Sequence, residues 1–392
     1  MNKKSVRDLD VDGKRVLVRV DFNVPIEDGK VTDDTRIRRA LPTIENLLER
    51  GARPALISHL GRPKGEPDPK YAMDPVARKL EELLKAPVLK LGTAIGPEVR
   101  RAVDGSSGGV VLLENSRFYP GETENDPEFS EELASPFDLY VDDAFGAAHR
   151  AHATVVGVAE LLPSAAGLLL EDELDHLDEV LKDPKRPFVA ILGGAKVSDK
   201  VGVIESLLDV ADTLLIGGAM CFTFLKARGY GIGNSLVEEG YLNAAKKLME
   251  EAGEKLVLPV DVVVAERMEE GAGSEVVRVE EIPEGYMGLD IGPETVEKFK
   301  GHIRDASTVF WNGPMGVFEI EAFAKGTEGL ARAVAEGRAR SIIGGGDSVA
   351  AVNKLGLEDE MSFISTGGGA SLEYVEGKEL PGVAVLPGKE KI

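Results

Sequence analysis

The feature that most constrains the fold of this chain is the regular alternation of short apolar runs with helical segments. The apolar runs include Val16–Val20, Ala55–Ile57, Val110–Leu113, Val189–Leu192, Thr213–Ile216 and Ser341–Ile343. Helical patterns lie between such runs, for example over Arg38–Arg50, Pro75–Lys85 and Gly240–Ala252. This alternation is typical of βαβ units and predicts an α/β fold with mostly parallel sheets. Ligands of such sheets bind beyond the carboxyl ends of the strands, so we look for the functional residues there.

The length of 392 residues is enough for two domains, and one segment is suited to join them. Leucines 170, 174, 177 and 181 form one apolar face of a helix of about 14 residues. Two X-Pro pairs, at residues 183–184 and 186–187, then end this helix. We therefore expect domains over residues 1–168 and 184–370, joined by a helix over 169–183. The pattern alone also allows a crossover helix inside one domain.

Composition and charge limit the classes of function. The net charge of −22 argues against a protein that binds nucleic acids or anionic membranes in general. The single cysteine, Cys221, excludes an internal disulfide and favours a reducing cytoplasm. We find no signal peptide and no apolar run of membrane-spanning length, so we expect a cytoplasmic protein with small-molecule ligands.

Basic side chains follow the early strands. His59 and Arg62 lie in SHLGRP, Arg117 in LLENSRF and Arg150 in DDAFGAAHRAH, and Arg36 is a further candidate for the same cluster. Arginine and histidine at the ends of neighbouring strands suit a small, strongly anionic substrate.

Two polar residues and two histidines in the same half have alternative interpretations. Asp21 and Asn23 share one side of an extended segment and could bind substrate hydroxyls, although Asp, Asn and Pro are also turn residues. His149 and His152 have no third ligand nearby, so we do not expect zinc.

Glycine clusters follow the later strands, at GGAKVSDK, GGGDSVAA and STGGGAS. Glycine lets phosphates approach the backbone, and Lys196 and Lys200 are spaced to share one face of a helix that begins at this point. Asp347 beside such a site suits Mg²⁺, which takes one or two carboxylates plus phosphate oxygens. A tight turn with surface lysines, and a helix cap at Asp347, are the simpler alternatives.

Several common motifs do not occur in the sequence. It contains no Walker A motif, no G-x-G-x-x-G fingerprint, no G-x-S-x-G elbow and no protein-kinase signature. From the residues alone we infer a phosphoryl-transfer enzyme or a nucleotide-dependent ligase. A dehydrogenase on a doubly wound fold and a non-catalytic sensor of nucleotides or sugar acids are the rival hypotheses.

Taken in order, the motifs closely resemble those of the phosphoglycerate kinase family. The resemblance runs from Val16 to about Pro387 and includes VDFNVP, TDDTRIRRALPTI, SHLGRPKG, DDAFGAAHRAHA, GGAKVSDK, GLDIGP, WNGPMGVFE and GGGDSVAA. It implies two doubly wound, Rossmann-like parallel-sheet domains joined by a hinge helix, with a tail over 371–392 that packs back on the first domain. It also implies phosphoryl transfer between 1,3-bisphosphoglycerate and Mg-ADP, giving 3-phosphoglycerate and Mg-ATP, by a monomer.

The resemblance assigns expected roles to individual residues. The phosphoglycerate would be held by Asp21, Asn23, Arg36, His59, Arg62, Arg117 and Arg150. Arg36 and Lys196 would act on the transferring phosphoryl group, and Lys200 would hold the nucleotide phosphates. The nucleotide site would be lined by Gly194, Gly288, Asn312, Glu319, Gly345, Gly346, Asp347 and Ser348. Within that site Glu319 would bind the ribose and Asp347 the Mg²⁺.

The sequence departs from the family pattern at three positions. Thr154 stands where Ser is frequent and Ser348 where Thr is frequent, and both changes keep a hydroxyl. Asp142 stands where the family often has Asn, and it adds a negative charge near the expected anion site.

Overall fold

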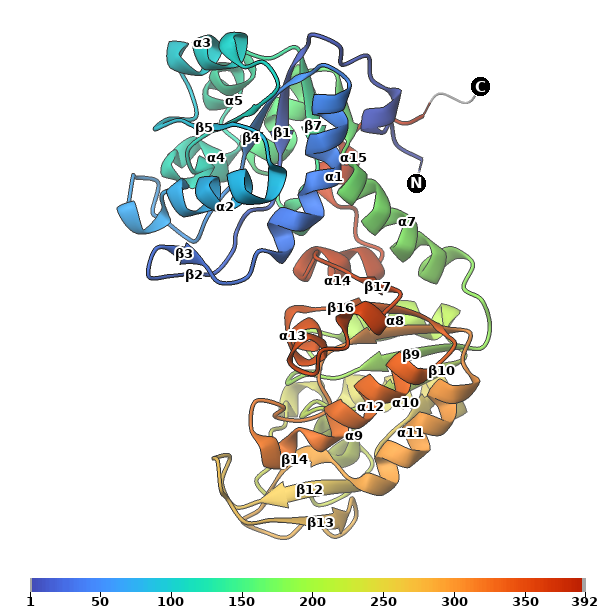
Figure 1. Ribbon diagram of the computed structural model, residues 1–392. Coiled ribbons are helices and arrows are strands. Elements are labelled where there is room, and N and C mark those ends of the chain that lie inside the picture. Colours follow the sequence, from blue (N-terminus) through green and yellow to red (C-terminus); the bar gives the residue numbers. More distant parts are fainter. Residues whose placement is uncertain (1, 390–392) are drawn as a thin grey trace. The chain divides into compact units, whose positions relative to one another are not determined.

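The protein folds into two compact units, which we describe separately using a computed structural model that covers residues 2–389 (Figure 1). Unit 1 comprises the chain up to Asp175 and again from Glu379, and unit 2 comprises His176–Lys378. The boundary falls inside helix α7 (Leu168–Lys182), so this helix belongs to both units. Its Leu170, Leu174 and Leu177 are buried.

Unit 1 is built on a six-stranded sheet in which every pairing is parallel, in the order β5-β6-β4-β1-β7-β8. The strands are β1 (Arg15–Arg19), β4 (Arg53–Ile57), β5 (Val88–Lys90), β6 (Val110–Leu112), β7 (Leu139–Asp142) and β8 (Ser164–Ala166). The helices are α1 (Thr35–Glu49), α2 (Asp74–Leu84), α3 (Pro97–Gly105), α4 (Pro120–Glu124), α5 (Pro127–Ala134), α6 (Val158–Leu161) and α15 (Pro381–Ala384). A short antiparallel pair, β2 (Ile26–Glu27) and β3 (Lys30–Val31), completes the unit.

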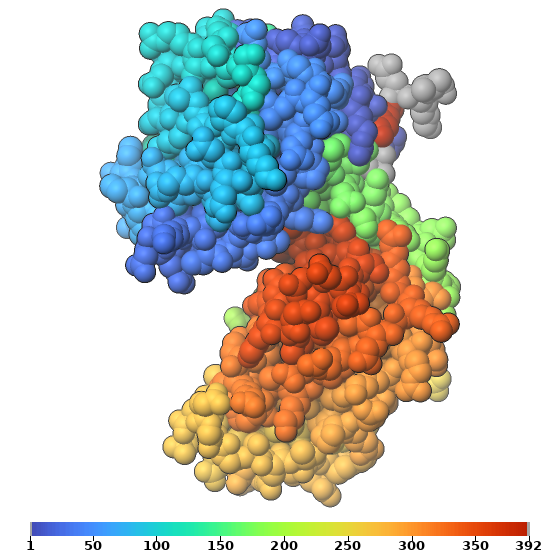
Figure 2. Space-filling view, in the orientation of Figure 1, coloured from blue at the N-terminus to red at the C-terminus, as the bar shows by residue number. Residues whose placement is uncertain are grey.

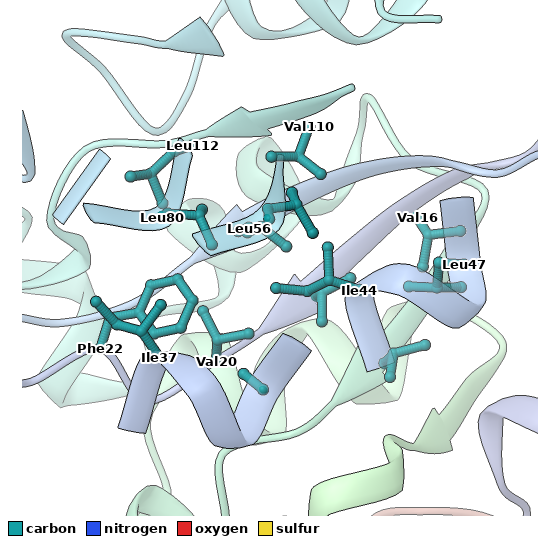
Figure 3. Close-up of a cluster of buried hydrophobic side chains, with 14 of the residues drawn as sticks. Val16, Val20, Phe22, Ile37, Ile44, Leu47, Leu56, Leu80, Val110 and Leu112 are labelled. Atoms are coloured by element: carbon teal, nitrogen blue, oxygen red, sulfur yellow. The ribbon is translucent and has the colours of Figure 1, made fainter. Parts of the chain in front are cut away.

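Apolar side chains on both faces of this sheet explain its layers. Successive side chains of a strand point to opposite faces, so Val16 and Val18 of β1 enter one core and Leu17 enters the other. Helices α1 and α2 cover the first face, where Ile37, Ile44 and Leu47 of α1 are fully buried (Figure 3). Helices α3, α5 and α6 cover the second face. A sheet buried on both faces is the doubly wound arrangement that the sequence predicts.

Unit 2 repeats this plan. Its main sheet has the order β11-β10-β9-β15-β16-β17, again with every pairing parallel. The strands are β9 (Phe188–Leu192), β10 (Thr213–Ile216), β11 (Leu256–Val257), β15 (Thr308–Asn312), β16 (Arg340–Gly344) and β17 (Phe363–Ile364). The helices are α8 (Val201–Val210), α9 (Cys221–Ala227), α10 (Leu242–Ala252), α11 (Pro293–Asp305), α12 (Lys325–Glu336), α13 (Gly346–Lys354) and α14 (Gly369–Val375). The prediction of two doubly wound parallel sheets is therefore confirmed.

Unit 2 also contains a smaller antiparallel sheet that the sequence patterns did not reveal. It has the order β13-β12-β14 and consists of β12 (Asp261–Ala265), β13 (Ser274–Arg278) and β14 (Met287–Ile291). Edge strand β13 is mostly exposed, and the segment that carries it, yellow to light orange in Figure 2, lies at the surface. Strands β12 and β14 are largely buried, and their ends approach the first turns of α11 and α12.

We predicted that the C-terminal tail returns to unit 1 from residue 371. In the structure, the tail returns later in the chain than that. Helix α14 still belongs to unit 2, where it packs against α8, and the return begins at Glu379. Beyond this point Gly382 N donates a hydrogen bond to Ala148 O at 2.9 Å, and Lys4 N donates to Pro387 O at 2.9 Å. In the part of the chain that the structure describes, no helix is both long and apolar enough to cross a membrane.

The start of α7 is anchored by one side chain from α1 and one from the residue that follows β7. The hydroxyl Oγ1 of Thr43 accepts a hydrogen bond from Leu168 N at 2.8 Å. Asp143 Oδ1 accepts hydrogen bonds from Leu169 N at 2.9 Å and Leu170 N at 3.4 Å, so it caps the helix without being adjacent in sequence.

We predict that Thr43→Val lowers the free energy of unfolding of unit 1 by about 1–3 kcal/mol, because the partly buried N–H of Leu168 loses its acceptor. The control is Thr32→Val, whose hydroxyl lies in an exposed loop at 3.4 Å from Pro25 O and should matter by less than about 0.5 kcal/mol. Urea unfolding monitored by circular dichroism measures both values. Equal stabilities of the two variants would contradict the anchoring role.

Candidate active site

The predicted phosphoglycerate residues of unit 1 gather at one edge of its sheet. Strands β6, β4, β1 and β7 are neighbours, and the segments that leave their carboxyl ends carry the polar side chains. We call the following residues the basic cluster: Arg19, Arg36, His59, Arg62, Arg117 and Arg150. All except Arg19 were predicted from the sequence.

Asp21, Asn23 and Arg36 form a connected group. Arg36, in the first turn of α1, donates to Asp21 Oδ2 at 2.6 Å, and its side chain remains 35% exposed. Asn23 Oδ1 accepts a hydrogen bond from Gly61 N at 2.9 Å, while Asn23 N donates to Asp21 Oδ1 at 3.3 Å. Together with the bond from Val24 N to Phe22 O at 2.9 Å, these contacts form a local turn, as the turn interpretation of the sequence expects.

Arg19 is the functional residue that the sequence analysis missed. It is fully buried and donates to Thr154 Oγ1 at 2.9 Å, to the backbone oxygen of Val20 and to His59 Nδ1 at 2.9 Å. A charged residue in the middle of the apolar run VLVRV was the available signal. Its partners come from distant parts of the chain, and no local pattern predicts them.

Burial and the contact with Arg19 together determine the charge of His59 and which of its ring nitrogens carries the proton. Burial lowers the pKa of His59 well below its ordinary value, and the charges of Arg19, Arg117 and Arg150 lower this pKa further. A guanidinium can only donate, so His59 Nδ1 accepts and the ring proton resides on Nε2. His59 is therefore a neutral donor whose Nε2–H remains for a ligand.

Arg117 and His152 lie in the same low-dielectric surroundings. Burial lowers the pKa of Arg117 to about 10, with Arg150 and Arg19 contributing in the same direction, so Arg117 keeps its charge at neutral pH. Burial and the neighbouring arginines lower the pKa of His152 to about 4, so this histidine is neutral. Arg117 is fixed by donating to Gly61 O at 2.6 Å. Arg62 is exposed.

Two buried acids lie close to this positive charge. Glu122 accepts hydrogen bonds from Thr154 N at 3.0 Å and Thr154 Oγ1 at 2.6 Å. Asp142 accepts one from Ala144 N at 3.0 Å, and its Oδ2 has no hydrogen-bond partner among the described residues. Burial raises the pKa of Asp142 to about 7, although Ala144 N–H and the charge of Arg19 act to lower it. Thr154, the family departure noted above, thus links Arg19 to Glu122.

The glycine clusters of unit 2 also meet at one sheet edge. Strands β10, β9, β15 and β16 are neighbours, and each ends in or beside glycine. The glycine cradle, as we name it, comprises Gly193, Gly194, Gly217, Gly218 and Gly313. The backbones touch here, since a Cβ atom on Gly218 would lie 2.4 Å from Gly194 N. Only residues without a side chain allow this approach.

The two lysines of unit 2 differ from our prediction that they share one face of a helix. Helix α8 begins at Val201, so Lys196 precedes it and is exposed, whereas Lys200 stands at its start and is buried. Residues 197–200 form a turn instead, because Ser198 N donates to the distant Glu238 and Lys200 N donates to Val197 O. Burial lowers the pKa of Lys200 to about 8.

Asn312 and Lys200 form the centre of the predicted phosphate site. Lys200 Nζ donates to Asn312 Oδ1, and Asn312 Nδ2 has no hydrogen-bond partner among the described residues. The side chain of Asp347 is exposed in the first turn of α13 and acts electrostatically on Lys200. Gly345 lies against Asn312, because a Cβ atom there would be 2.8 Å from Nδ2.

The remaining predicted nucleotide residues lie in different surroundings. Ser348 is fully buried, and its Oγ accepts a hydrogen bond from Gly313 N at 2.5 Å, so it ties α13 to the end of β15. Gly288 packs against the ring of Phe222. Glu319 is exposed on the loop that follows β15, and Gly346 opens α13.

A metal site formed by the protein alone is not evident in residues 2–389, where no group of three or more His, Cys, Asp or Glu side chains is suited to hold an ion. His149 and His152 accordingly do not form such a group. The exposed carboxylate of Asp347 fits Mg²⁺ only as part of a shared site, because Mg²⁺ is commonly held by one or two carboxylates and substrate phosphates.

These features define an α/β protein with a basic cluster at the sheet edge of one unit and a glycine cradle beside a buried lysine on the other. The family model described as phosphoglycerate kinase matches residues 6–378, and the chain belongs to this family. It is 76% identical over 392 residues to the phosphoglycerate kinase of Rubrobacter xylanophilus, covering all of both chains. The solved structure of the enzyme from Coxiella burnetii is 44% identical, with a TM-score of 0.88 and 98% of both chains covered. The enzyme from Pyrococcus horikoshii is 33% identical, with a TM-score of 0.84 and the same coverage.

We predict that Asp142→Asn changes how the stability of unit 1 depends on pH. The folded-state pKa of about 7 exceeds the unfolded value of about 3.9, so folding takes up a proton between these values. The contribution of Asp142 to the free energy of unfolding of the parent therefore falls as pH rises from about 4 to about 7. The free energy of unfolding of Asp142→Asn, measured relative to that of the parent, should therefore increase by about 2–3 kcal/mol from pH 5 to pH 8.

Urea unfolding at the two pH values tests this expectation. Asp28→Asn is the matched control for the chemical change, because Asp28 is exposed in a turn. If the parent and Asp142→Asn curves run parallel, Asp142 does not titrate in this range.

Proposed function

We propose that this enzyme transfers a phosphoryl group reversibly between 1,3-bisphosphoglycerate and Mg-ADP, giving 3-phosphoglycerate and Mg-ATP. The observation that carries the proposal is the basic cluster at the carboxyl edge of the unit 1 sheet, in a chain that belongs to the phosphoglycerate kinase family. The chain is a kinase of glycolysis by this relationship. The alternative of a non-catalytic sensor finds no support among the relatives, which are named as the enzyme.

Unit 1 would bind the phosphoglycerate. Its guanidinium groups can each donate two parallel hydrogen bonds to a carboxylate or phosphate, and they resist deprotonation on burial. The neutral His59 would donate from Nε2. Asp21 and Asn23 would orient the hydroxyl end of the substrate, while Arg62, Arg117 and Arg150 would surround its phosphate and carboxylate groups. The ligand supplies the negative charge that this cluster lacks.

Unit 2 would bind the nucleotide. Within the glycine cradle, Gly194 has open space where a Cβ atom would lie, and Gly345, Gly346 and the start of α13 would offer backbone N–H groups to phosphates. The amide Nδ2 of Asn312 and the ammonium group of Lys200 would donate to phosphate oxygens. Glu319 would bind the ribose, with Gly194 and Gly288 lining the rest of the site. Ser348, being buried, would act by holding Gly313 in place.

Asp347 would hold Mg²⁺ together with the nucleotide phosphates. When bound, the ion supplies positive charge that neutralises the phosphate oxygens during transfer. The protein's own contribution here is an exposed carboxylate at the start of a helix whose N–H groups face the same phosphates. Lys200 supplies a second positive charge nearby.

Arg36 and Lys196 would stabilise the transferring group. Phosphoryl transfer depends on positioning and on charge stabilisation more than on covalent chemistry by the protein. Both side chains are accessible, since Arg36 is 35% exposed and Lys196 is exposed. We further propose that α7 serves as a hinge, that closure excludes water from the acyl phosphate, and that the enzyme works as a monomer in the cytoplasm.

We predict that Arg36→Ala and Lys196→Ala each lower kcat by about 10²–10³-fold, because a charge contact made in the transition state is lost. The assay supplies 3-phosphoglycerate and Mg-ATP and couples bisphosphoglycerate formation to NADH oxidation. Arg38→Ala is the control, since Arg38 pairs with Asp34 on the exposed side of the same helix.

Three results would be distinguished by this assay. Turnover by the parent with large losses in both variants supports the reaction and the two roles. A folded parent without turnover overturns the proposed reaction. Turnover that the substitutions leave unchanged keeps the reaction and removes Arg36 and Lys196 from the catalytic group.

We predict that Asp347→Asn raises the Mg²⁺ concentration needed for half-maximal rate by about tenfold or more, because an amide is a weaker ligand for this hard cation. Titrating Mg²⁺ at saturating ATP measures the change, and binding of Mg-ADP by calorimetry gives a readout that is independent of turnover. Asp359→Asn, on an exposed turn, should behave as the parent does. An unchanged Mg²⁺ dependence in Asp347→Asn would exclude this carboxylate as the ligand.

A further inference from the structure

Asp290 is a buried carboxylate of unit 2 to which the proposed mechanism assigns no role. It lies on β14 and is only 3% exposed. Its Oδ2 accepts a hydrogen bond from Gly326 N at 2.7 Å, and its Oδ1 accepts one from Ile291 N at 2.9 Å. Gly326 is in the first turn of α12, so Asp290 caps this helix from a distant strand.

The same carboxylate lies directly against the loop formed by residues 313–319, which we call the nucleotide loop. A Cβ atom on Gly316 would lie 2.3 Å from Asp290 Oδ1, and one on Gly326 would lie 2.2 Å from this oxygen. Neither position could carry a side chain without moving the carboxylate. Asp290 therefore occupies the space between the nucleotide loop and the start of α12.

Two further hydrogen bonds fasten the nucleotide loop to the same elements. Val317 N donates to Leu289 O of β14 at 2.9 Å, and Met315 N donates to Thr327 Oγ1 of α12 at 2.9 Å. The loop leads from Asn312 to Glu319, both of which belong to the proposed nucleotide site. Its position thus depends on the junction between β14 and α12, where Asp290 lies.

We propose that Asp290 is a positioning residue for nucleotide binding, which holds the nucleotide loop and α12 in register through its two accepting oxygens and its contact with Gly316. This inference rests on the proposed nucleotide site of unit 2. Asp290 touches no reacting atom in this account, and it acts through the loop that carries Glu319.

Protonation of Asp290 should loosen this junction. Burial raises the pKa of Asp290 to about 7, the Gly326 and Ile291 N–H groups lower it, and Glu328 on α12 raises it. In the nucleotide loop, Gly316 lies against the carboxylate. On β12, Val263 is the residue that pairs with Asp290 in the sheet. A protonated oxygen becomes a donor and accepts poorly, so one of the two backbone N–H groups loses its partner below about pH 7.

A matched control exists one strand away. Asp261 on β12 is also buried and accepts hydrogen bonds from Glu294 N at 3.0 Å and Thr295 N at 2.7 Å. It caps α11 as Asp290 caps α12, and a Cβ atom on Gly292 would likewise collide with its carboxylate. These contacts of Asp261 involve β12 and α11, and none of them reaches the nucleotide loop. Asp261→Asn therefore reproduces a lost helix cap without a change at the loop.

The test compares Asp290→Asn and Asp261→Asn in the full-length enzyme with Mg-ADP or Mg-ATP as the varied substrate. For Asp290→Asn we expect the KM for nucleotide to rise about tenfold while kcat changes by less than about twofold, because ground-state binding is weakened. In the parent, this KM should rise as pH falls from 8 to 6, and Asp290→Asn should lose that dependence. Asp261→Asn should lower stability in urea yet keep the parent KM and its pH profile.

Gly326→Ala is a second route to the same result if Asp290→Asn folds poorly, because the new methyl group displaces the carboxylate while keeping its charge. A tenfold higher KM in either variant, absent from Asp261→Asn, supports the inference. Equal effects of Asp290→Asn and Asp261→Asn on KM, or a parent KM with the same pH profile as Asp290→Asn, would overturn it. A folded parent without turnover or calorimetric Mg-ADP binding would instead refute the proposed function.

Discussion

The constraint on which unit 1 depends is the concentration of like positive charges in a protein whose net charge is −22. Arg19 extends this positive charge into the interior, because it is fully buried and contacts His59 of the same cluster. Its hydrogen bond to His59 Nδ1 determines which His59 nitrogen carries the proton, and its hydrogen bond to Thr154 holds the guanidinium in place. Buried Glu122 and Asp142 lie nearby, and burial together with neighbouring charges shifts the pKa values of Arg117, Asp142 and His152. Arg36 is paired with Asp21 within the protein, whereas Arg62 is exposed.

The sequence predicted the parallel sheets because their signal is local. An apolar run such as Val189–Leu192 becomes a buried strand almost residue for residue. The errors arose where distant contacts decide the structure. Lys196 and Lys200 were expected on one helix, but Glu238, 40 residues along the chain, binds Ser198 in a turn. The antiparallel sheet β13-β12-β14 and the position at which the tail returns are likewise fixed by packing between segments far apart in sequence.

In the candidate active site, too, residues with a local sequence signal could be predicted, and residues placed by distant contacts could not. Residues at strand ends, such as His59 and Arg117, could be predicted because the edge of a parallel sheet brings them together. Arg19 could not, since its contact with Thr154 spans 135 positions. The sequence also did not reveal that Ser348 is buried against Gly313, because a hydroxyl after glycines predicts phosphate binding and backbone support equally well. Local pattern thus identified which residues gather, while burial decided which of them can touch a ligand.

Under the proposed function, the two units would hold anions by different chemistry. Unit 1 uses guanidinium groups, and Arg117 keeps its charge with a pKa of about 10 despite burial. Unit 2 uses backbone N–H groups and one buried ammonium group, whose pKa of about 8 is already close to neutrality. Without the charges of Asp199, Asp347 and Glu376, which raise this pKa, Lys200 would lose its proton more readily. Nucleotide phosphates add negative charge at the same place, so binding itself would keep Lys200 protonated. The three carboxylates near Lys200 would therefore be compatible with an anionic ligand, because they favour the charged form of this buried lysine.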